Sequence, residues 1–222
     1  MASVASHFLK RVPRTVACIY TRSMDDTPNS TVARLREYLN DARQAVIFKS
    51  GQLSEELARQ PMTPTGTHVL GVVHHLAITE YGYFGACLNR PVNDSYLQQL
   101  LDIDDPQADF IPPADASAQQ VIELYQRAIA FAEAGFDQLE LASPAEVPWW
   151  VRHRHTTLEH LMVHMIAETS RHAGHLDIVR ELLDGQVGLR AEVPNLPDYT
   201  PRQWQEQRDR LQQTAQSKRG SD

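Results

Sequence analysis

The sequence predicts an all-α protein, a four-helix bundle with a long crossover loop and an extra C-terminal helix. Three observations support this fold class. Four long segments carry apolar residues at spacings of three and four, which is the period of an amphipathic helix. No segment alternates convincingly between apolar and polar residues as a half-buried strand would. The second and third segments are separated by an acidic, proline-broken stretch that is too polar for a core element.

The composition excludes several classes of protein. The chain of 222 residues is long enough for one well-buried domain with tails. Its net charge of −7, without a basic stripe, argues against nucleic-acid binding. No apolar run approaches the ~20 residues of a membrane span, so no membrane contact is expected. The two cysteines, Cys18 and Cys87, show neither metal-binding nor redox spacing, which predicts a reduced cytoplasmic setting.

Residues 1–23 contain basic side chains and no acidic ones, unlike the rest of the chain. This bias is typical of a transit peptide, but it also arises if translation starts at Met24, which is the interpretation that we favour. In either case the tail is expected to be poorly ordered. The predicted organisation is this tail, a bundle of residues 24–185, and a C-terminal loop and helix, residues 186–222, packed on the bundle with a frayed end.

The first two helices are predicted over residues 30–50 and 67–89, and Gly51 ends the first of them. The second is apolar nearly all round and should be the most buried element. His74 and His75 lie in its middle, flanked by valine, leucine and isoleucine. An unpaired buried imidazole costs about 1–3 kcal/mol, so each of these histidines needs a partner, and a metal ion is one such partner.

The crossover, residues 91–116, is rich in aspartate and proline and contains neither lysine nor arginine. We expect a long ordered loop with one short helical piece around residues 96–101, and long ordered loops tend to be functional. A third helix is predicted over residues 117–141, with Ser117 and Gln120 as its cap.

The fourth helix, with a predicted capping box of Thr156 and Glu159 and an end at Asp184-Gly185, carries the main functional signal. Four polar residues recur there at every fourth position and project from one side, namely His160, His164, Glu168 and His172. Imidazole and carboxylate groups at this spacing lie about 5–6 Å apart and can bind one divalent ion. Because a bundle builds metal sites from facing helices, His75 is the natural third ligand, whereas a solvated histidine face is the alternative without a metal.

An aromatic and cationic cluster, Trp149, Trp150 and Arg152, immediately precedes the fourth helix. The tryptophans either plug the end of the bundle or, together with Arg152, border a pocket for an anionic substrate. Farther along the chain, a loop leads to an amphipathic helix over residues 201–215, which Trp204 is expected to hold against the bundle.

The second helix reads VVHHLAITEYGYFG, and the fourth helix with its approach reads HTTLEHLMVHMIAETSRHAGHLDIVRELLDG. These two stretches resemble the DinB/YfiT-like superfamily, in the branch related to mycothiol-dependent maleylpyruvate isomerases. The resemblance implies a divalent metal held by His75, Glu168 and His172, and it places the two preceding histidines of the fourth helix outside the usual ligand set. His175 lies one turn beyond His172, where it can approach the metal or a substrate.

The resemblance further implies a divalent-metal-dependent enzyme with a low-molecular-weight thiol, such as mycothiol or bacillithiol, as its cosubstrate. This enzyme would transfer the sulfur of the thiol to a small electrophile, or it would use the thiol to assist a reaction of the electrophile. Zinc is the expected metal, and iron, nickel and manganese are the alternatives. The candidate cofactor-binding residues are Trp149, Trp150, Arg152 and His175, and no catalytic residue is assigned.

The same set of two histidines and one carboxylate is compatible with two other functions. One is a non-catalytic metal-binding protein of stress response or sequestration, and the other is a non-haem iron enzyme that uses oxygen. The expected partners are a small-molecule substrate and a small thiol, with no nucleic acid and no membrane. A homodimer is the one assembly left open.

Overall fold

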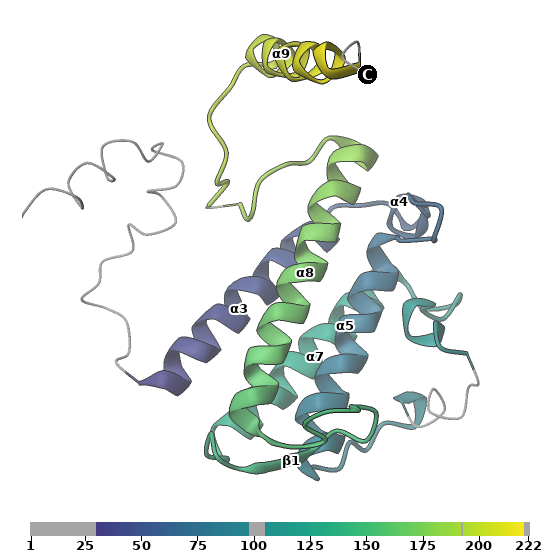
Figure 1. Ribbon diagram of the computed structural model, residues 1–222. Helices are drawn as coiled ribbons and strands as arrows, with labels where there is room; N and C mark the ends of the chain where they lie inside the picture. Colours follow the sequence, from purple (N-terminus) through teal and green to yellow (C-terminus); the bar gives the residue numbers. More distant parts are fainter. Residues whose placement is uncertain (1–29, 98–104, 192, 220–222) are drawn as a thin grey trace, which may run out of the picture. The chain divides into compact units, whose positions relative to one another are not determined.

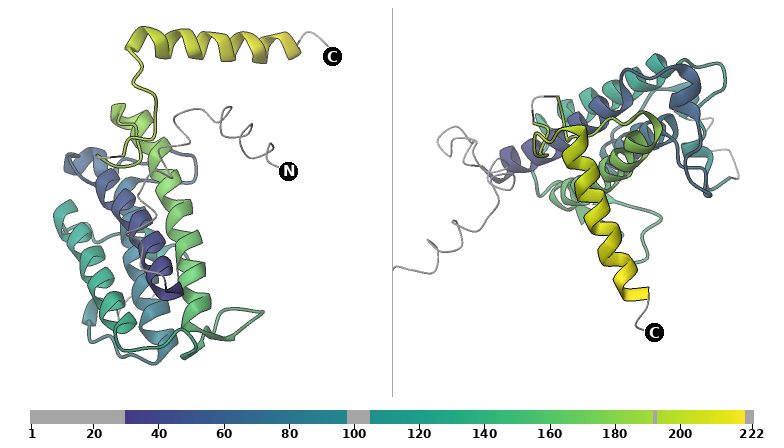
Figure 2. Two further views of the ribbon diagram at one scale, coloured as in Figure 1. Left: turned by 90° about the vertical axis from the view of Figure 1, so that its left-hand side faces the viewer. Right: turned by 90° about the horizontal axis from the view of Figure 1, so that it is seen from above.

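The computed structural model describes residues 30–97, 105–191 and 193–219. The chain divides into two compact units, and the larger unit, Ser23–Pro194, contains the bundle. Its long helices are α3 (Thr31–Ser50), α5 (Val69–Phe84), α7 (Ala118–Phe136) and α8 (Leu158–Asp184). These helices run side by side, with α3 packed on α8 and α5 packed on both α7 and α8 (Figures 1 and 2). The prediction of an all-α four-helix bundle is confirmed.

Side-chain caps fix where these helices begin. Ser117 and Gln120 form the predicted capping box of α7. The predicted cap of α8 is wrong by one residue, because the N-cap is Thr157, whose hydroxyl accepts a hydrogen bond from the His160 N–H. Thr156 instead lies in a strand, and its hydroxyl meets the His160 ring.

Two short strands, β1 (Pro144–Glu146) and β2 (His155–Thr157), pair antiparallel just before α8. No strand was predicted, because three residues are too few to show an alternating pattern. The hairpin carries the tryptophan segment in its loop and leads directly into α8.

Two helices end earlier than predicted, α5 at Phe84 and α7 at Phe136. Gly85 follows α5, and a Cβ atom there would lie 2.3 Å from the Tyr81 carbonyl oxygen, so only glycine fits this close approach. A short 3-10 helix, η1 (Ala86–Leu88), continues the chain. The structure also contains a short helix that was not predicted, α4 (Glu55–Arg59), capped by Ser54.

The core lies between the four long helices, and α5 is buried along most of its length, as predicted. On α8 the apolar residues Leu161, Met162, Met165 and Leu176 are fully buried. Ile178, in contrast, is 59% exposed, although the following Val179 and Arg180 are buried.

The second unit contains α9 (Pro201–Arg219), close to the predicted last helix. That this helix packs on the bundle stays a prediction. Residues 1–29 lie outside the described part of the chain, and so do the predictions of a poorly ordered tail and of a start at Met24. The predicted helical piece around residues 96–101 lies mostly outside it as well, although residues 95–97 are helical. Among the helices that the structure describes, none is both long and apolar enough to span a bilayer.

Candidate metal centre

Three side chains from two helices converge at the middle of the bundle, His75 from α5 and Glu168 and His172 from α8. The Oε1 atom of Glu168 lies 3.3 Å from Nε2 of His75 and 3.1 Å from Nε2 of His172. One ligand atom from each residue lies within 4.8 Å of the other two. Donor atoms about 2.1 Å from a tetrahedral ion are about 3.4 Å apart, so the two separations from Glu168 suit a single small cation.

The fold explains why these side chains meet. Glu168 and His172 are one turn apart on the same side of α8, so both face the neighbouring helix. Helix α5 packs on α8 along this side and presents His75 from its middle (Figure 1). The structure therefore brings the three predicted residues together, while their role as metal ligands stays a prediction.

His75 is held between two carboxylates. Its Nδ1 atom lies 2.6 Å from Oδ2 of Asp109, and its Nε2 atom faces Glu168. A neutral imidazole carries a single N–H and can donate to only one carboxylate. If Nδ1–H donates to Asp109, the lone pair of Nε2 points toward Glu168, and a cation between them would satisfy both. This carboxylate–histidine arrangement is the one that orients histidine ligands in known metal sites, so the residues fit a metal ion.

The protonation states also suit metal binding. Burial alone would raise the pKa of Glu168, but hydrogen bonds and charge from His75 and His172 outweigh it, so the pKa of this carboxyl is lowered. Burial, together with the charge of His75, lowers the pKa of His172. An ionised carboxylate and a neutral imidazole are the forms that bind metals.

Phe110, from the 3-10 helix η2 (Ala108–Phe110) of the crossover, covers the centre. Its ring stacks on His75 with centroids 4.1 Å apart and planes inclined by 12°. The Phe110 ring also lies 6.0 Å from the His172 ring. This apolar cover limits the access of water and strengthens electrostatic interactions at the three ligand atoms.

His74 faces away from the centre, as expected for consecutive helical residues. Its Nδ1–H donates to the backbone carbonyl of Asp109 at 2.5 Å, and its Nε2 accepts from the Tyr96 hydroxyl at 2.6 Å. Burial lowers the pKa of His74 and so favours the neutral ring that this pattern requires. The partner of this buried histidine is therefore the crossover rather than a metal.

The predicted cofactor-binding residues occupy different surroundings. The ring of His175 lies 5.2 Å from that of His172, next to the centre. The indole N–H groups of Trp149 and Trp150 donate to the Tyr83 hydroxyl at 3.2 and 3.3 Å, so both tryptophans belong to one aromatic cluster. Arg152 is exposed. A role in cofactor binding stays a prediction for all four residues.

The aromatic cluster is connected to the centre through α8. The Trp150 ring packs on His164 and His160, at centroid distances of 4.9 and 5.2 Å. His164 lies one turn before Glu168. Burial lowers the pKa of His164, and the negative charge of Glu168 partly opposes this shift. The polar side of α8 therefore has two parts. His160 and His164 pack against the aromatic cluster near the hairpin, and Glu168 and His172 belong to the three-ligand centre farther along the helix.

Sequence reasoning did not assign a role to Asp109, Phe110 or Tyr96. The crossover lacks a helical or strand period, so its pairing with α5 cannot be derived from spacing. Two signals pointed toward it, namely the requirement that His74 and His75 have partners and the many aspartates of the segment.

The fold and the site define the class of protein, an all-α bundle whose facing helices present two imidazoles and one carboxylate to a common point. The chain belongs to the mycothiol-S-transferase family, because the family model described as "Mycothiol-S-transferase" matches residues 34–185. This confirms the resemblance to the DinB/YfiT-like superfamily.

A crystal structure of a conserved protein from Enterococcus faecalis is similar to this chain, with a TM-score of 0.57 and 16% sequence identity. The similarity covers 72% of this chain and 100% of that one, and at this identity it supports the fold alone. No curated protein matches the chain.

Proposed function

We propose that this protein binds one divalent metal ion through His75, Glu168 and His172 and transfers a low-molecular-weight thiol, mycothiol or a similar one, to a small electrophile. The observation that carries the proposal is the convergence of the three ligand atoms within 4.8 Å in a member of the mycothiol-S-transferase family. Zinc is the metal that we expect, because the donor set of nitrogen and oxygen suits it. The same donor set is also found with iron, nickel and manganese.

The chain's own residues prepare such a centre. Asp109 accepts a hydrogen bond from His75 Nδ1–H and leaves the Nε2 lone pair free for a metal ion. Glu168 supplies the negative charge, and Phe110 restricts water on one side. A divalent ion held by these three residues would lower the pKa of a small thiol, so that the thiol would be deprotonated near neutral pH. In a substitution reaction the sulfur forms a bond to the electrophilic carbon, the leaving group departs with its electron pair, and the thiol proton passes to solvent.

Cys87 does not compete with an added thiol as the nucleophile. Its side chain is buried, and burial together with the charge of Glu146 raises its pKa to about 11. A thiol with this pKa is almost fully protonated near neutral pH and therefore unreactive. The other cysteine, Cys18, lies outside the described residues. A nucleophilic sulfur from a small cosubstrate is consistent with the family.

The test combines metal analysis with thiol-dependent turnover of the full-length protein. We expect about one zinc ion per chain and consumption of monochlorobimane that requires mycothiol or bacillithiol. Both should fall together in His75→Ala, Glu168→Gln and His172→Ala. Glu159→Gln is the matched control, because Glu159 is exposed in the first turn of the same helix.

Two results would contradict the proposal. Wild-type turnover by the metal-stripped protein would show that the thiol is not activated at this centre. Iron as the bound metal, with oxygen uptake and no thiol dependence, would instead favour a non-haem iron enzyme, which uses the same ligand types.

A further inference from the structure

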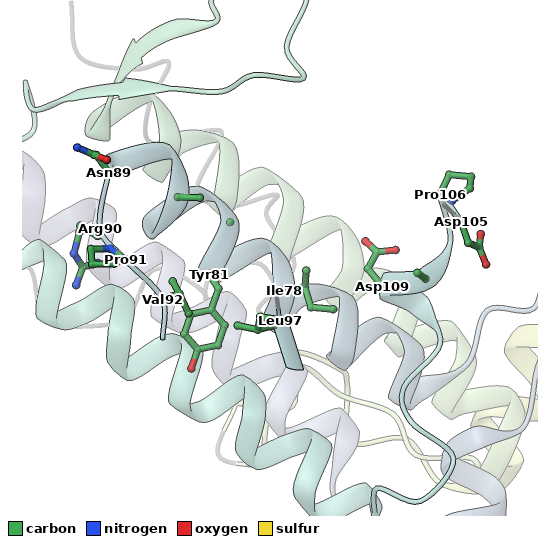
Figure 3. Close-up of a pocket in the computed structure, with 13 residues that line it drawn as sticks. Ile78, Tyr81, Asn89, Arg90, Pro91, Val92, Leu97, Asp105, Pro106 and Asp109 are labelled. Atoms are coloured by element: carbon green, nitrogen blue, oxygen red, sulfur yellow. The ribbon is translucent and has the colours of Figure 1, made fainter. Parts of the chain in front are cut away.

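A cavity of ≈ 630 Å³ lies against α5 and the crossover, beside the candidate metal centre (Figure 3). Side chains and backbone of α5, of residues 89–97 and of residues 105–109 line it. Its volume falls within the range of about 300–1,000 Å³ that is usual for small-molecule sites. Trp149, Trp150 and Arg152, which the sequence analysis placed around a substrate pocket, are not among its lining residues.

The cavity is continuous with the centre in two respects. Ile78 and Gly82 line it and follow His75 on α5 at offsets of three and seven residues, so all three lie on one side of the helix. Asp109 lines the cavity as well and is the residue whose carboxylate contacts His75. A molecule in the cavity therefore lies along the same stripe of α5 that presents a candidate ligand.

Most lining residues are apolar, among them Ile78, Ala86, Pro91, Val92 and Leu97. Gly82 widens the cavity, because a Cβ atom at this position would meet nothing within 4 Å. Burial of the body of a ligand here is driven by the apolar area removed from water. The lining therefore selects a predominantly apolar molecule.

The charges around the cavity leave an excess of negative charge. Arg90 lines the cavity, but its guanidinium donates to the carbonyl oxygens of Phe84 and Phe131 at 2.8 and 3.0 Å. It also stacks on the Phe131 ring at 4.1 Å, so part of this guanidinium is engaged in holding the chain. Asp105 and Asp109 are the other charged residues among those that line the cavity in the described part of the chain.

Asp109 retains capacity for a further hydrogen bond. One carboxylate oxygen contacts His75, whereas the other, Oδ1, is buried and has no partner among the described residues. A buried carboxylate oxygen without a donor is unfavourable by about 1–3 kcal/mol. The Asp109 side chain as a whole is 30% exposed and lines the cavity, so a ligand with an N–H or O–H group at this end can approach its carboxylate.

We propose that this cavity binds the electrophilic substrate and that the substrate is a mainly apolar molecule with a cationic or hydrogen-bond-donating end directed at Asp105 and Asp109. This assignment of a substrate class rests on the function proposed above. Anionic substrates are disfavoured, because the two aspartates outweigh the single positive charge of Arg90, which also donates to two backbone carbonyls.

The first test measures binding to the full-length protein without any reaction. The probes are naphthalenemethylamine, naphthalenemethanol and naphthaleneacetate, which share the aromatic body and differ in charge. The amine is expected to bind about tenfold more tightly than the carboxylate, with the alcohol between them. Asp105→Asn should reduce the preference for the amine over the alcohol. A carboxylate that binds as tightly as the amine would overturn the proposed substrate class.

The second test fills the cavity. Gly82→Leu places a side chain into the space and should weaken binding of the amine at least about tenfold, while the helix tolerates leucine better than glycine. Gly174→Leu is the matched control, because Gly174 is also helical with open space around it, but it is exposed on α8 and does not line the cavity. Equal binding by the two variants would overturn the site.

A third measurement separates this proposal from the proposed function. If thiol transfer occurs, Gly82→Leu should raise the KM for monochlorobimane and leave the KM for mycothiol unchanged. Transfer with an unchanged KM for the electrophile would overturn the cavity as the substrate site while the function stands. Gly82-dependent binding of the amine by a protein that lacks thiol transfer would instead support the cavity as a binding site and contradict the function.

Discussion

Helix α5 carries two buried polar clusters, and they are completed in different ways. One turn beyond His75, Glu80 forms a fully buried ion pair with Arg43 of α3, in which two nitrogens of the guanidinium bond the two carboxylate oxygens at 2.7 Å each. A third bond joins Arg43 to Glu133 of α7 at 2.7 Å. This cluster links three helices and leaves neither oxygen of Glu80 without a partner.

The cluster around His75 is incompletely paired. One oxygen of Glu168 faces two imidazoles, and Oδ1 of Asp109 and Nδ1 of His172 are buried without partners among the described residues. Buried polar groups are nearly always paired in folded proteins, and two unpaired ones beside the same three side chains agree with the proposed metal site. The comparison teaches that the carboxylate of Glu80 is completed within the fold, whereas the His75 cluster leaves groups for a ligand or ion to complete, as the proposed function requires.

The largest effect is expected from breaking the ion pair. Glu80→Ala leaves the Arg43 charge buried without its main partner and should lower the free energy of unfolding by about 3–5 kcal/mol, measured by urea denaturation. Glu168→Gln in the metal-free protein should change it by only about 1 kcal/mol or less, since the amide keeps an acceptor oxygen. If both variants lost similar stability, the distinction between the clusters would be wrong.

A smaller effect is expected at Asp109. Asp109→Asn weakens the orientation of His75 and should reduce the metal affinity about 10–100-fold, measured by competition with a chelating indicator. Asp105→Asn is the control, because its carboxylate accepts from the Gln107 N–H and does not touch His75. An unchanged affinity in Asp109→Asn would show that the carboxylate does not support the metal centre.

The smallest effect concerns pH. Burial lowers the pKa of His68, His74 and His172 from the ordinary value of 6.5. Above pH 6.5 these rings are neutral in both states, and below it the unfolded chain takes up protons that the folded chain does not. The metal-free protein should therefore lose stability on acidification below pH 6.5, which urea denaturation at a series of pH values measures.

His68 allows this pH dependence to be assigned. Its Nδ1 atom accepts the hydrogen bond from the Gly71 N–H that caps α5, and a protonated ring cannot accept it. Asparagine is a good N-cap and does not titrate, so His68→Asn should keep the stability at neutral pH and make its decline in acid shallower. Equal slopes for the variant and the wild type would exclude a contribution from His68.

The sequence predicted the bundle and the convergence of His75, Glu168 and His172 because both depend on local spacing. Helical period, caps and the four-residue interval are short-range features, and bundle topology makes the ligand helices neighbours. The resemblance then selected these three residues from the longer row of polar side chains on α8.

The contacts that complete the site were not predicted, because they are long-range and come from a segment without a period. Asp109 reaches His75 across 34 positions of the chain. The pairing of Arg43 with Glu80 was missed for a related reason, since a charged residue in a helix gives no sign of which partner it meets in the core. The cap of α8 was predicted one residue too early, at Thr156, because this residue belongs to a strand that is too short to recognise from the sequence.

The crossover forms a wall of the cavity without belonging to either ligand helix, and this has an evolutionary consequence. Substitutions at residues 89–97 and 105–108 alter the shape and charge of the cavity, while His75, Glu168 and His172 stay on α5 and α8. Under the proposed function, duplicated copies of such a gene can therefore acquire new substrates through changes in one segment while the proposed metal ligands are inherited unchanged. We expect relatives with the same three ligands to diverge first in this wall, with Asp109 retained longest.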